Sequence, residues 1–332
     1  MKKLFVLIIS SLVLLTSLCG CSFKAVFSSH SGEYLVSAMG FDEKNGKLEI
    51  CVEAIIVNTE DTEAEPSLEL ISGNGDTVKE AFFDAAGKTS QELLLSHCGI
   101  IALGESVTPD TFSQINEFCR SQKDITISAM FISCKDSKKL LSSKAISSVA
   151  VGYDIMSMLS YKSKKTGINY KNRFYEIESF KGKPQNLFSL PFFEKTENGY
   201  FINGLKIYDN YAPLALLDSE QTAIFSVMTD TQSKGSFMLE KQEIFLNSSY
   251  AMWNVSKNSN LDFTLSLRLE TKDSKEKIKK ATQDLFRLFQ ENGKDIFGLG
   301  NIIYTKNHAV WDDIKKDYQS HFKNSTLRVE FI

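Results

Sequence analysis

Residues 33–60 read EYLVSAMGFDEKNGKLEICVEAIIVNTE, and this stretch predicts a β-hairpin. Two runs rich in apolar residues, 34–41 and 47–57, lie on either side of Asn45 and Gly46. Asn-Gly is the pair that best tolerates the positive φ angles of a tight two-residue turn. The two runs are therefore expected to form paired strands.

Downstream of the hairpin, helix and strand patterns alternate. A polar, acidic loop leads into ISGNGDTVKEAFFDAAGKTS, which predicts a glycine turn and then a helix over about 77–87. Asp76 fits the N-cap of this helix and Gly87 its end. The run CGIIALGES predicts a short apolar strand, TPDTFSQINEFCRS a helix with Pro109 in its first turn, and DITISAMFISCKD a further strand. This alternation over residues 34–135 favours a mixed sheet covered by helices.

The pattern changes in the second half of the chain. Residues 144–180 look helical, GKPQ at 182–185 interrupts the pattern, and a domain boundary is expected between there and Asn198. Beyond the boundary we expect strands at 187–195, 200–208, 235–247, 260–270 and in TLRVEFI, and helices over about 218–228 and near 308–318. The predicted division is a signal peptide at 1–20, an N-terminal α/β region at 21–190 and a C-terminal domain at 198–332.

The clearest helix of the chain is predicted over 274–291. Asp273 and Glu276 resemble a capping box at its start, and Gly293 fits its end. The residues expected to form its buried stripe are spaced three or four apart: Ile278, Ala281, Leu285, Leu288 and Phe289. The second half is thus strand-rich and carries one long amphipathic helix.

The N-terminus has the pattern of a bacterial lipoprotein signal. Two lysines precede the apolar run LFVLIISSLVLLTSL, which is shorter than the about 20 residues of a membrane span. Leu18-Cys19-Gly20-Cys21 then matches a lipobox, with Cys21 as the lipid carrier and Gly20 as the small residue at the cut. Lipid on Cys19 would place bulky Leu18 at the cut, so Cys19 is expected to leave with the peptide. An ordinary secretory signal and an uncleaved anchor helix are the alternatives.

Composition favours a folded body and gives no sign of a nucleic-acid partner. Apolar residues make up 42% and charged residues 24% of the chain, as in ordinary globular proteins. The net charge is −3, whereas phosphate binding needs a basic surface.

Four cysteines besides the lipobox pair lie in apolar runs: Cys51, Cys98, Cys119 and Cys134. They show no C-x-x-C spacing and no histidine at ligand distance, so a zinc site is not expected. Buried free thiols are the first interpretation, since an unpaired cysteine packs like a small hydrophobe. Two disulfides are the alternative outside the cytoplasm, and the sequence does not show a pairing.

We find no sequence motif of a catalytic or cofactor site. H-E-x-x-H, G-x-S-x-G and the phosphate-binding loop are missing, SGNG at 72–75 is expected to be a turn, and SHFK matches S-x-x-K without its companion motifs. His97 is expected to be a buried structural histidine, and Trp253 and Trp311 are expected to anchor a core or a domain interface. No catalytic residue, cofactor or metal is therefore expected.

Four segments, in order, carry a resemblance to a known family. They are the lipobox followed by GFD at 40–42, SGNGDTVKEAFFDAAGKTSQELLLSHCGIIALGE at 72–105, YFINGLKIYDNYAPLALLDSEQTAIFSVMT at 200–229 and KDIFGLGNIIYTKNHAVWDDI at 294–314. Together they resemble the Ger(x)C family, the lipoprotein C subunits of spore germinant receptors. The chain departs from the family after Cys21, where SFKAVFSSHSGE replaces an expected Trp-Asp and a nearby Glu, and at its C-terminus, which lacks a polar tail.

The resemblance implies an α+β protein with mixed sheets covered by helices, whose two sequence domains resolve into three compact units. It also implies integral membrane A and B subunits as partners in the inner membrane of the spore. The expected function is that of a non-enzymatic subunit of a nutrient germinant receptor, tethered to the outer face of the cell membrane by a lipid such as palmitate on Cys21. The alternatives are a solute-binding lipoprotein of a membrane transporter and, less well supported, a surface hydrolase.

Overall fold

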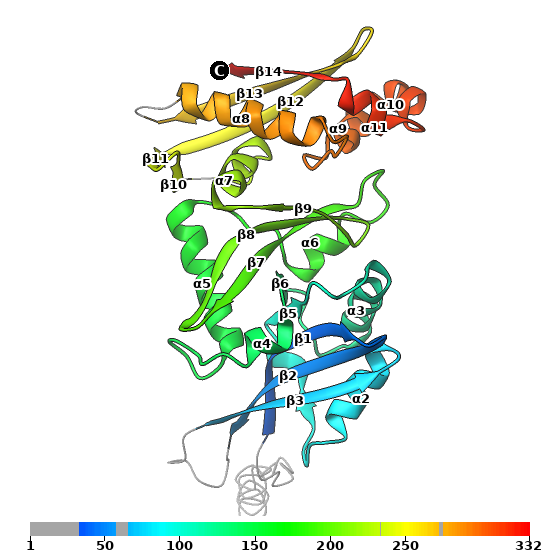
Figure 1. The fold of residues 1–332 in the computed structure, drawn as a ribbon, viewed down its shortest axis with the longest axis vertical. Helices are drawn as coiled ribbons and strands as arrows, with labels where there is room; N and C mark the ends of the chain where they lie inside the picture. Colours follow the sequence, from blue (N-terminus) through cyan, green and yellow to red (C-terminus); the bar gives the residue numbers. More distant parts are fainter. Residues whose placement is uncertain (1–32, 58–65, 233, 272–274) are drawn as a thin grey trace, which may run out of the picture.

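The computed structural model describes residues 33–57, 66–232, 234–271 and 275–332. They form an elongated molecule of three stacked parts (Figure 1). We call residues 33–141 the N-terminal part, 151–217 the middle part and 219–332 the C-terminal part. The α+β class with mixed sheets, expected from the resemblance, is confirmed.

One mixed sheet runs through the N-terminal and middle parts. Its strand order is β3-β2-β1-β5-β6-β7-β8-β9, with β4 paired to β1. The strands are β1 Glu33–Lys44, β2 Lys47–Val57, β3 Ser67–Gly75, β4 Leu93–Leu94, β5 Ile100–Leu103, β6 Met130–Cys134, β7 Leu187–Thr196, β8 Gly199–Asp209 and β9 Ala212–Leu217. The central pairs β1–β5, β5–β6 and β6–β7 are parallel, and the outer pairs are antiparallel. The sheet continues through the predicted boundary at 190–198, which falls in the β7–β8 hairpin; the division into sequence domains stays a prediction.

Helices cover both faces of this sheet. On one face lie α2 Val78–Ala86, α3 Pro109–Ser121 and α6 Phe174–Glu178, and on the other α4 Ser137–Leu141 and α5 Val151–Thr166. Each face of the sheet has its own hydrophobic core. Alternate residues of β5 pack in the two cores, because successive side chains of a strand point to opposite faces. Ile101 and Leu103 pack with α2 and α3, whereas Ile100 and Ala102 pack with α4 and α5.

The C-terminal part has its own small sheets and one core. It contains α7 Ser219–Met228, the hairpin β10 Gly235–Leu239 and β11 Gln242–Leu246, the sheet of β12 Ser248–Lys257, β13 Leu261–Glu270 and β14 Thr326–Phe331, and the helices α8 Lys275–Gln290, α9 Leu299–Lys306, α10 His308–Ile314 and α11 Tyr318–Lys323. Trp253 anchors the core as predicted: it is 6% exposed, and its Nε1 donates to the Met228 carbonyl at 2.8 Å. Trp311 is half-buried against the same core.

The predicted N-terminal hairpin is confirmed, but the predicted glycine turn after it is wrong. Asn45 and Gly46 have φ angles of 54° and 73° and join β1 to β2. SGNG at 72–75 instead forms the end of a strand, β3, which was not predicted. A Cβ on Gly73 would lie 2.1 Å from the Ala81 carbonyl oxygen, so this glycine serves the close approach of α2 to β3.

Three further local predictions are wrong: an N-cap, the burial of a histidine and the length of a strand. The N-cap of α2 is Thr77, whose Oγ1 accepts from Glu80 N at 3.2 Å, and not Asp76. His97 is exposed, because the single 3₁₀ turn Leu95–His97 directs Leu95 inward instead. Residues 235–247 form two strands rather than one, since Glu240 and Lys241 make a tight turn with positive φ angles.

The long helix is confirmed as α8, but its buried stripe differs from the prediction. Leu288 is 46% exposed and Ala281 is half-buried. Thr282 and Phe286 complete the stripe with Ile278, Leu285 and Phe289. The predicted capping residue Asp273 lies outside the described residues. The helical region expected over 144–180 is reduced to α5 and the short α6, and β9 and β12 were not predicted.

Candidate functional site between the middle and C-terminal parts

The residues that the sequence assigns to lipid attachment, Cys21 and Gly20, lie outside the described residues. Within the described ranges, no helix is long and apolar enough to cross a membrane, and no group of three or more His, Cys, Asp or Glu is placed to hold a metal ion. The described parts instead offer buried polar groups and cavities as candidate sites.

Buried carboxylates tie helices of the N-terminal and middle parts to the sheet. Asp42, from the GFD segment, accepts hydrogen bonds from Ser137 Oγ at 2.7 Å and from Lys138 N at 3.2 Å, at the start of α4. Glu53 accepts from Val151 N at 2.7 Å and from Gly152 N at 2.8 Å, at the start of α5. Burial raises the pKa of both carboxyls, and these hydrogen bonds oppose the rise. Such contacts to a helix N-terminus favour the charged form and hold the helix in place.

A third buried carboxylate, Asp295, organises the loop where the C-terminal part meets the middle part. Its Oδ1 accepts from Phe297 N at 3.0 Å, and its Oδ2 accepts from Gly300 N at 2.9 Å and from Tyr318 Oη at 2.7 Å. Burial raises the pKa of Asp295 despite these bonds. The Asp, aromatic and Gly-x-Gly residues noted at 295–300 thus shape the start of α9.

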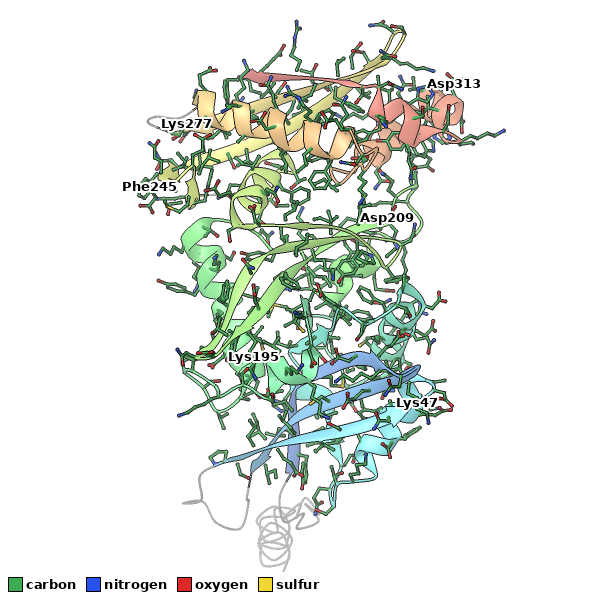
Figure 2. All side chains as sticks on the ribbon, in the orientation of Figure 1. Lys47, Lys195, Asp209, Phe245, Lys277 and Asp313 are labelled. Carbon is green, nitrogen blue, oxygen red and sulfur yellow. The ribbon has the colours of Figure 1, made fainter. Side chains whose placement is uncertain are left out.

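The linker before β7 is fixed to both parts. Gln185 N donates to Asn301 Oδ1 at 2.9 Å, and Asn301 Nδ2 donates back to the Gln185 carbonyl at 2.8 Å. The next residue, Asn186, donates its N–H to Asp209 Oδ1 at 3.2 Å, at the end of β8. Figure 2 shows Asp209 where the middle part faces the C-terminal part. The interruption predicted at GKPQ thus ends in a set of hydrogen bonds between the two parts. We call this set the junction; its residues are Gln185, Asn186, Asp209 and Asn301.

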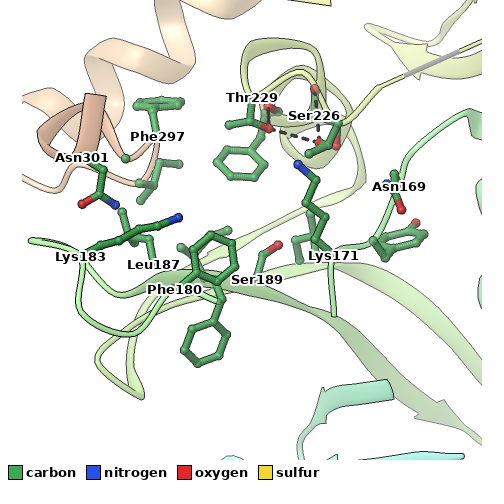
Figure 3. Close-up of a pocket in the computed structure, with 18 of the residues that line it drawn as sticks. Asn169, Lys171, Phe180, Lys183, Leu187, Ser189, Ser226, Thr229, Phe297 and Asn301 are labelled. Carbon is green, nitrogen blue, oxygen red and sulfur yellow. Dashed lines mark hydrogen bonds between the residues drawn. The ribbon is translucent and has the colours of Figure 1, made fainter. Parts of the chain in front are cut away.

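A pocket of about 260 Å³ lies beside this junction (Figure 3). Its apolar lining comes from both parts: Leu187, Phe188, Leu205 and Ile207 from the middle part, and Phe225, Ile296, Phe297 and Ile302 from the C-terminal part. Its charged lining residues are Lys171 and Lys183, and none of its lining residues is acidic. In Figure 3 the Lys183 ammonium points across the pocket, and the Lys171 ammonium points toward Ser226 and Thr229. The pocket thus combines an apolar interior with positive charge.

The polar groups of the pocket differ in what they can still bind. Ser226 Oγ donates to the Thr222 carbonyl at 2.8 Å, which leaves its oxygen as an acceptor. Thr229 Oγ1 donates to the Phe225 carbonyl at 2.8 Å and also lies within hydrogen-bond distance of Thr231 Oγ1, at 3.2 Å. Lys183 Nζ lies 4.8 Å from the centre of the Phe180 ring. No described carboxylate lies within ion-pair distance of Lys171 or Lys183, whereas Lys181 pairs with Glu178 at 2.6 Å.

The four cysteines of the described part are buried free thiols, as predicted: Cys51, Cys98, Cys119 and Cys134. Burial raises the pKa of Cys51 and of Cys98 to about 12, and it raises the pKa of Cys119 and of Cys134 well above the usual value. Thiols held in the protonated form inside a core are poor nucleophiles and metal ligands.

Sequence reasoning missed the pocket. Its two lysines are separated by the short helix α6, and its walls come from segments more than 100 residues apart. The usable signals were the GKPQ breaker and the Asp-aromatic-Gly-x-Gly segment, which lie on either side of the junction.

Two protein-family models match the chain. Residues 33–195 match the family model described as spore germination protein N-terminal domain. Residues 251–332 match the model described as spore germination B3/GerAC like, C-terminal. The chain belongs to the Ger(x)C family of spore germination proteins. Ger(x)C proteins are germinant receptor subunits that associate with membranes and are not known as enzymes.

A solved structure supports the same fold. It is described as "Crystal Structure of the GerBC protein" and superposes with a TM-score of 0.52 at 13% sequence identity, covering 88% of this chain and 95% of that chain. No curated protein matches the chain. The fold of this Ger(x)C protein is thus shared with GerBC, while most of the side chains differ.

Proposed function

We propose that this chain is the lipid-anchored, non-enzymatic C subunit of a nutrient germinant receptor that acts in spore germination. The observation that carries the proposal is the match of both its N-terminal and its C-terminal regions to spore germination families. The junction described above links these two regions by direct hydrogen bonds, so both are available in one body for contact with partners.

The proposed anchor is lipid on Cys21. Burying one CH₂ of an acyl chain contributes about 0.8 kcal/mol, so a single chain binds a membrane reversibly and two or more hold a protein there stably. Cys21 precedes β1 by a short segment of chain. The lipid thereby keeps the folded body close to the outer face of the cell membrane. In a spore, this membrane is the inner membrane.

The proposed partners are the integral membrane A and B subunits of the receptor. A tether turns the encounter with a partner in the same membrane into a nearly intramolecular event, so weak direct contacts suffice. A released body is expected to bind the same partners poorly.

The solute-binding lipoprotein is not favoured. Proteins of that class have two similar lobes of strand–helix units around a ligand cleft. Here the N-terminal and middle parts share one sheet of nine strands, and the C-terminal part has separate sheets of two and three strands. The described parts are therefore not two copies of one lobe.

The experiment is affinity capture of the full-length tagged protein from detergent-solubilised spore membranes. We expect an A-type and a B-type integral subunit to be recovered with it, and recovery to fail from a strain that lacks those subunits. Capture of a bound sugar, peptide or amino acid with no membrane partner would instead assign the protein to solute binding. Deletion of the gene is expected to remove the response to one class of nutrient and to leave other germination routes intact.

A further inference from the structure

We propose that the pocket between the middle and C-terminal parts binds a small organic anion that joins one carboxylate to a compact apolar body. The pocket is the one of about 260 Å³ beside the Gln185–Asn301 contact. This inference concerns a ligand of the C subunit itself, and it does not depend on the identity of the membrane partners.

The positive charge of the pocket favours a negatively charged ligand. Lys171 and Lys183 reach it from two sides, and no lining residue is acidic (Figure 3). Lys181, two residues before Lys183, is already neutralised by Glu178 at 2.6 Å. The two pocket lysines have no such described partner, so their ammonium groups are available to an anionic head.

The hydrogen-bonding groups argue against a cationic ligand. Ser226 and Thr229 could offer their oxygens to an ammonium group, since their protons are used within α7. In Figure 3, however, the Lys171 side chain points toward these two residues, so a cationic ligand bound there would lie beside a positive charge. The groups that can bind the head group of a ligand are therefore donors: the two ammonium groups and the side-chain amide of Asn169.

The volume of the pocket sets the size of the ligand. A dry cavity of about 150 Å³ holds a benzene molecule, and pockets for drug-sized ligands begin at about 300 Å³. A volume of about 260 Å³ therefore suits one ring or a short branched chain carrying one carboxylate. Leu187 from β7, with Phe225 and Phe297 from the C-terminal part, provides the apolar surface for that body.

Occupancy of the pocket has a structural consequence. Its walls belong to β7 and β8 on one side and to α7 and the loop before α9 on the other. A ligand seated there contacts both parts at once and adds to the hydrogen bonds of the junction. Binding is expected to raise the thermal midpoint of the protein, since a ligand that binds only the folded state stabilises it.

The test uses the full-length lipidated protein in nanodiscs, with empty nanodiscs as the blank, and fluorine NMR of three probes of equal size. They are 4-fluorobenzoate, its neutral analogue 4-fluorobenzamide and the cation 4-fluorobenzylamine. We expect 4-fluorobenzoate to bind at roughly millimolar concentration and at least about tenfold more tightly than the other two. Equal binding of benzoate and benzamide, or no binding of benzoate, would overturn the proposal.

Variants locate the binding site. Replacing both lysines in Lys171→Gln/Lys183→Gln is expected to weaken benzoate binding about tenfold and to leave benzamide binding unchanged. Lys181→Gln is the matched control, because Lys181 lies in the same loop but outside the pocket lining, and it is expected to change nothing. Ser189→Leu, which places a larger side chain in the pocket lining, is expected to abolish binding of all probes. Unchanged benzoate affinity in the double variant would refute the assignment, and so would unchanged affinity in Ser189→Leu with a native circular dichroism spectrum.

Discussion

Two hydrogen bonds join Asn301 to Gln185 across the junction. Both are between the side-chain amide of Asn301 and the backbone of Gln185. Gln185 N donates to Asn301 Oδ1 at 2.9 Å, and Asn301 Nδ2 donates to the Gln185 carbonyl at 2.8 Å. The pair joins the linker that precedes β7 to the helix α9 of the C-terminal part. One asparagine side chain thus replaces the backbone partners that a sheet would otherwise provide at this position.

Asn301→Leu is expected to lower the free energy of unfolding by about 1–3 kcal/mol, because it leaves the N–H and the carbonyl of Gln185 without partners in a half-buried place. Urea denaturation measures the loss. Asn292→Ala is the control: this exposed residue makes one hydrogen bond, to the Leu288 carbonyl of α8, and its change should stay within about 0.5 kcal/mol. If both variants are equally stable, the junction does not contribute to folding.

Asp154 is expected to make stability depend on acid. Burial alone would raise its pKa, but hydrogen bonds from Ile146 N, Ser147 Oγ and Tyr200 Oη lower that pKa to about 2. A lowered folded-state pKa gives stability that is present above the unfolded value of 3.8 and is lost as the pH falls through about 2. After allowance for solvent screening, the contribution is about 1–2 kcal/mol.

The measurement for Asp154 is the free energy of unfolding between pH 5 and pH 2 in the parent and in Asp154→Asn. The parent should lose about 1–2 kcal/mol more than the variant over this range. Asp284→Asn, an exposed position on α8, should follow the parent curve. Parallel curves for the parent and Asp154→Asn would show that the carboxylate has no depressed pKa.

Leu285 and Leu288 provide a matched pair on α8. Leu285 is 5% exposed and Leu288 is 46% exposed. Leu285→Ala is expected to cost about 2–5 kcal/mol, because it removes buried methyl groups and leaves a cavity. Leu288→Ala should cost less than about 1 kcal/mol. Denaturant melts compare the two, and a larger loss for Leu288 would mean that α8 presents its other face to the core.

Cys21→Ala tests the anchor. We expect the protein to remain uncleaved or to be released from membranes, because the acyl chains supply the affinity for the bilayer. Cys19→Ala, which changes the neighbouring cysteine of the signal, should behave like the parent. Mass spectrometry of the mature N-terminus and membrane fractionation make the measurement. An unmodified Cys21 on a protein that does not partition into membranes would contradict the lipoprotein proposal.

Local sequence signals determined several elements of this protein. The Asn45–Gly46 pair predicts the β1–β2 hairpin, because asparagine and glycine accept positive φ angles at the lowest steric cost. Pro109 and the apolar spacing after it predict α3, and the spacing over 274–291 predicts α8. These predictions depend only on residues close in the chain. The family resemblance was likewise readable from ordered segments of sequence, and the family matches confirm it.

Tertiary structure alone decided which residues meet. Gly73 looked like part of a turn, but its pairing with Ile50 of β2 places it in a strand, and its close approach to Ala81 places that strand beneath a helix. Lys171 and Lys183 carry no pattern in the sequence, and their relation to Phe297 arises when α7 and α9 pack above β7. Short-range propensity acts within a few residues, whereas a pocket or a junction forms from side chains that chain folding brings together. The sequence of this protein therefore determined its local elements and its family, and the packing of its three parts decided the site.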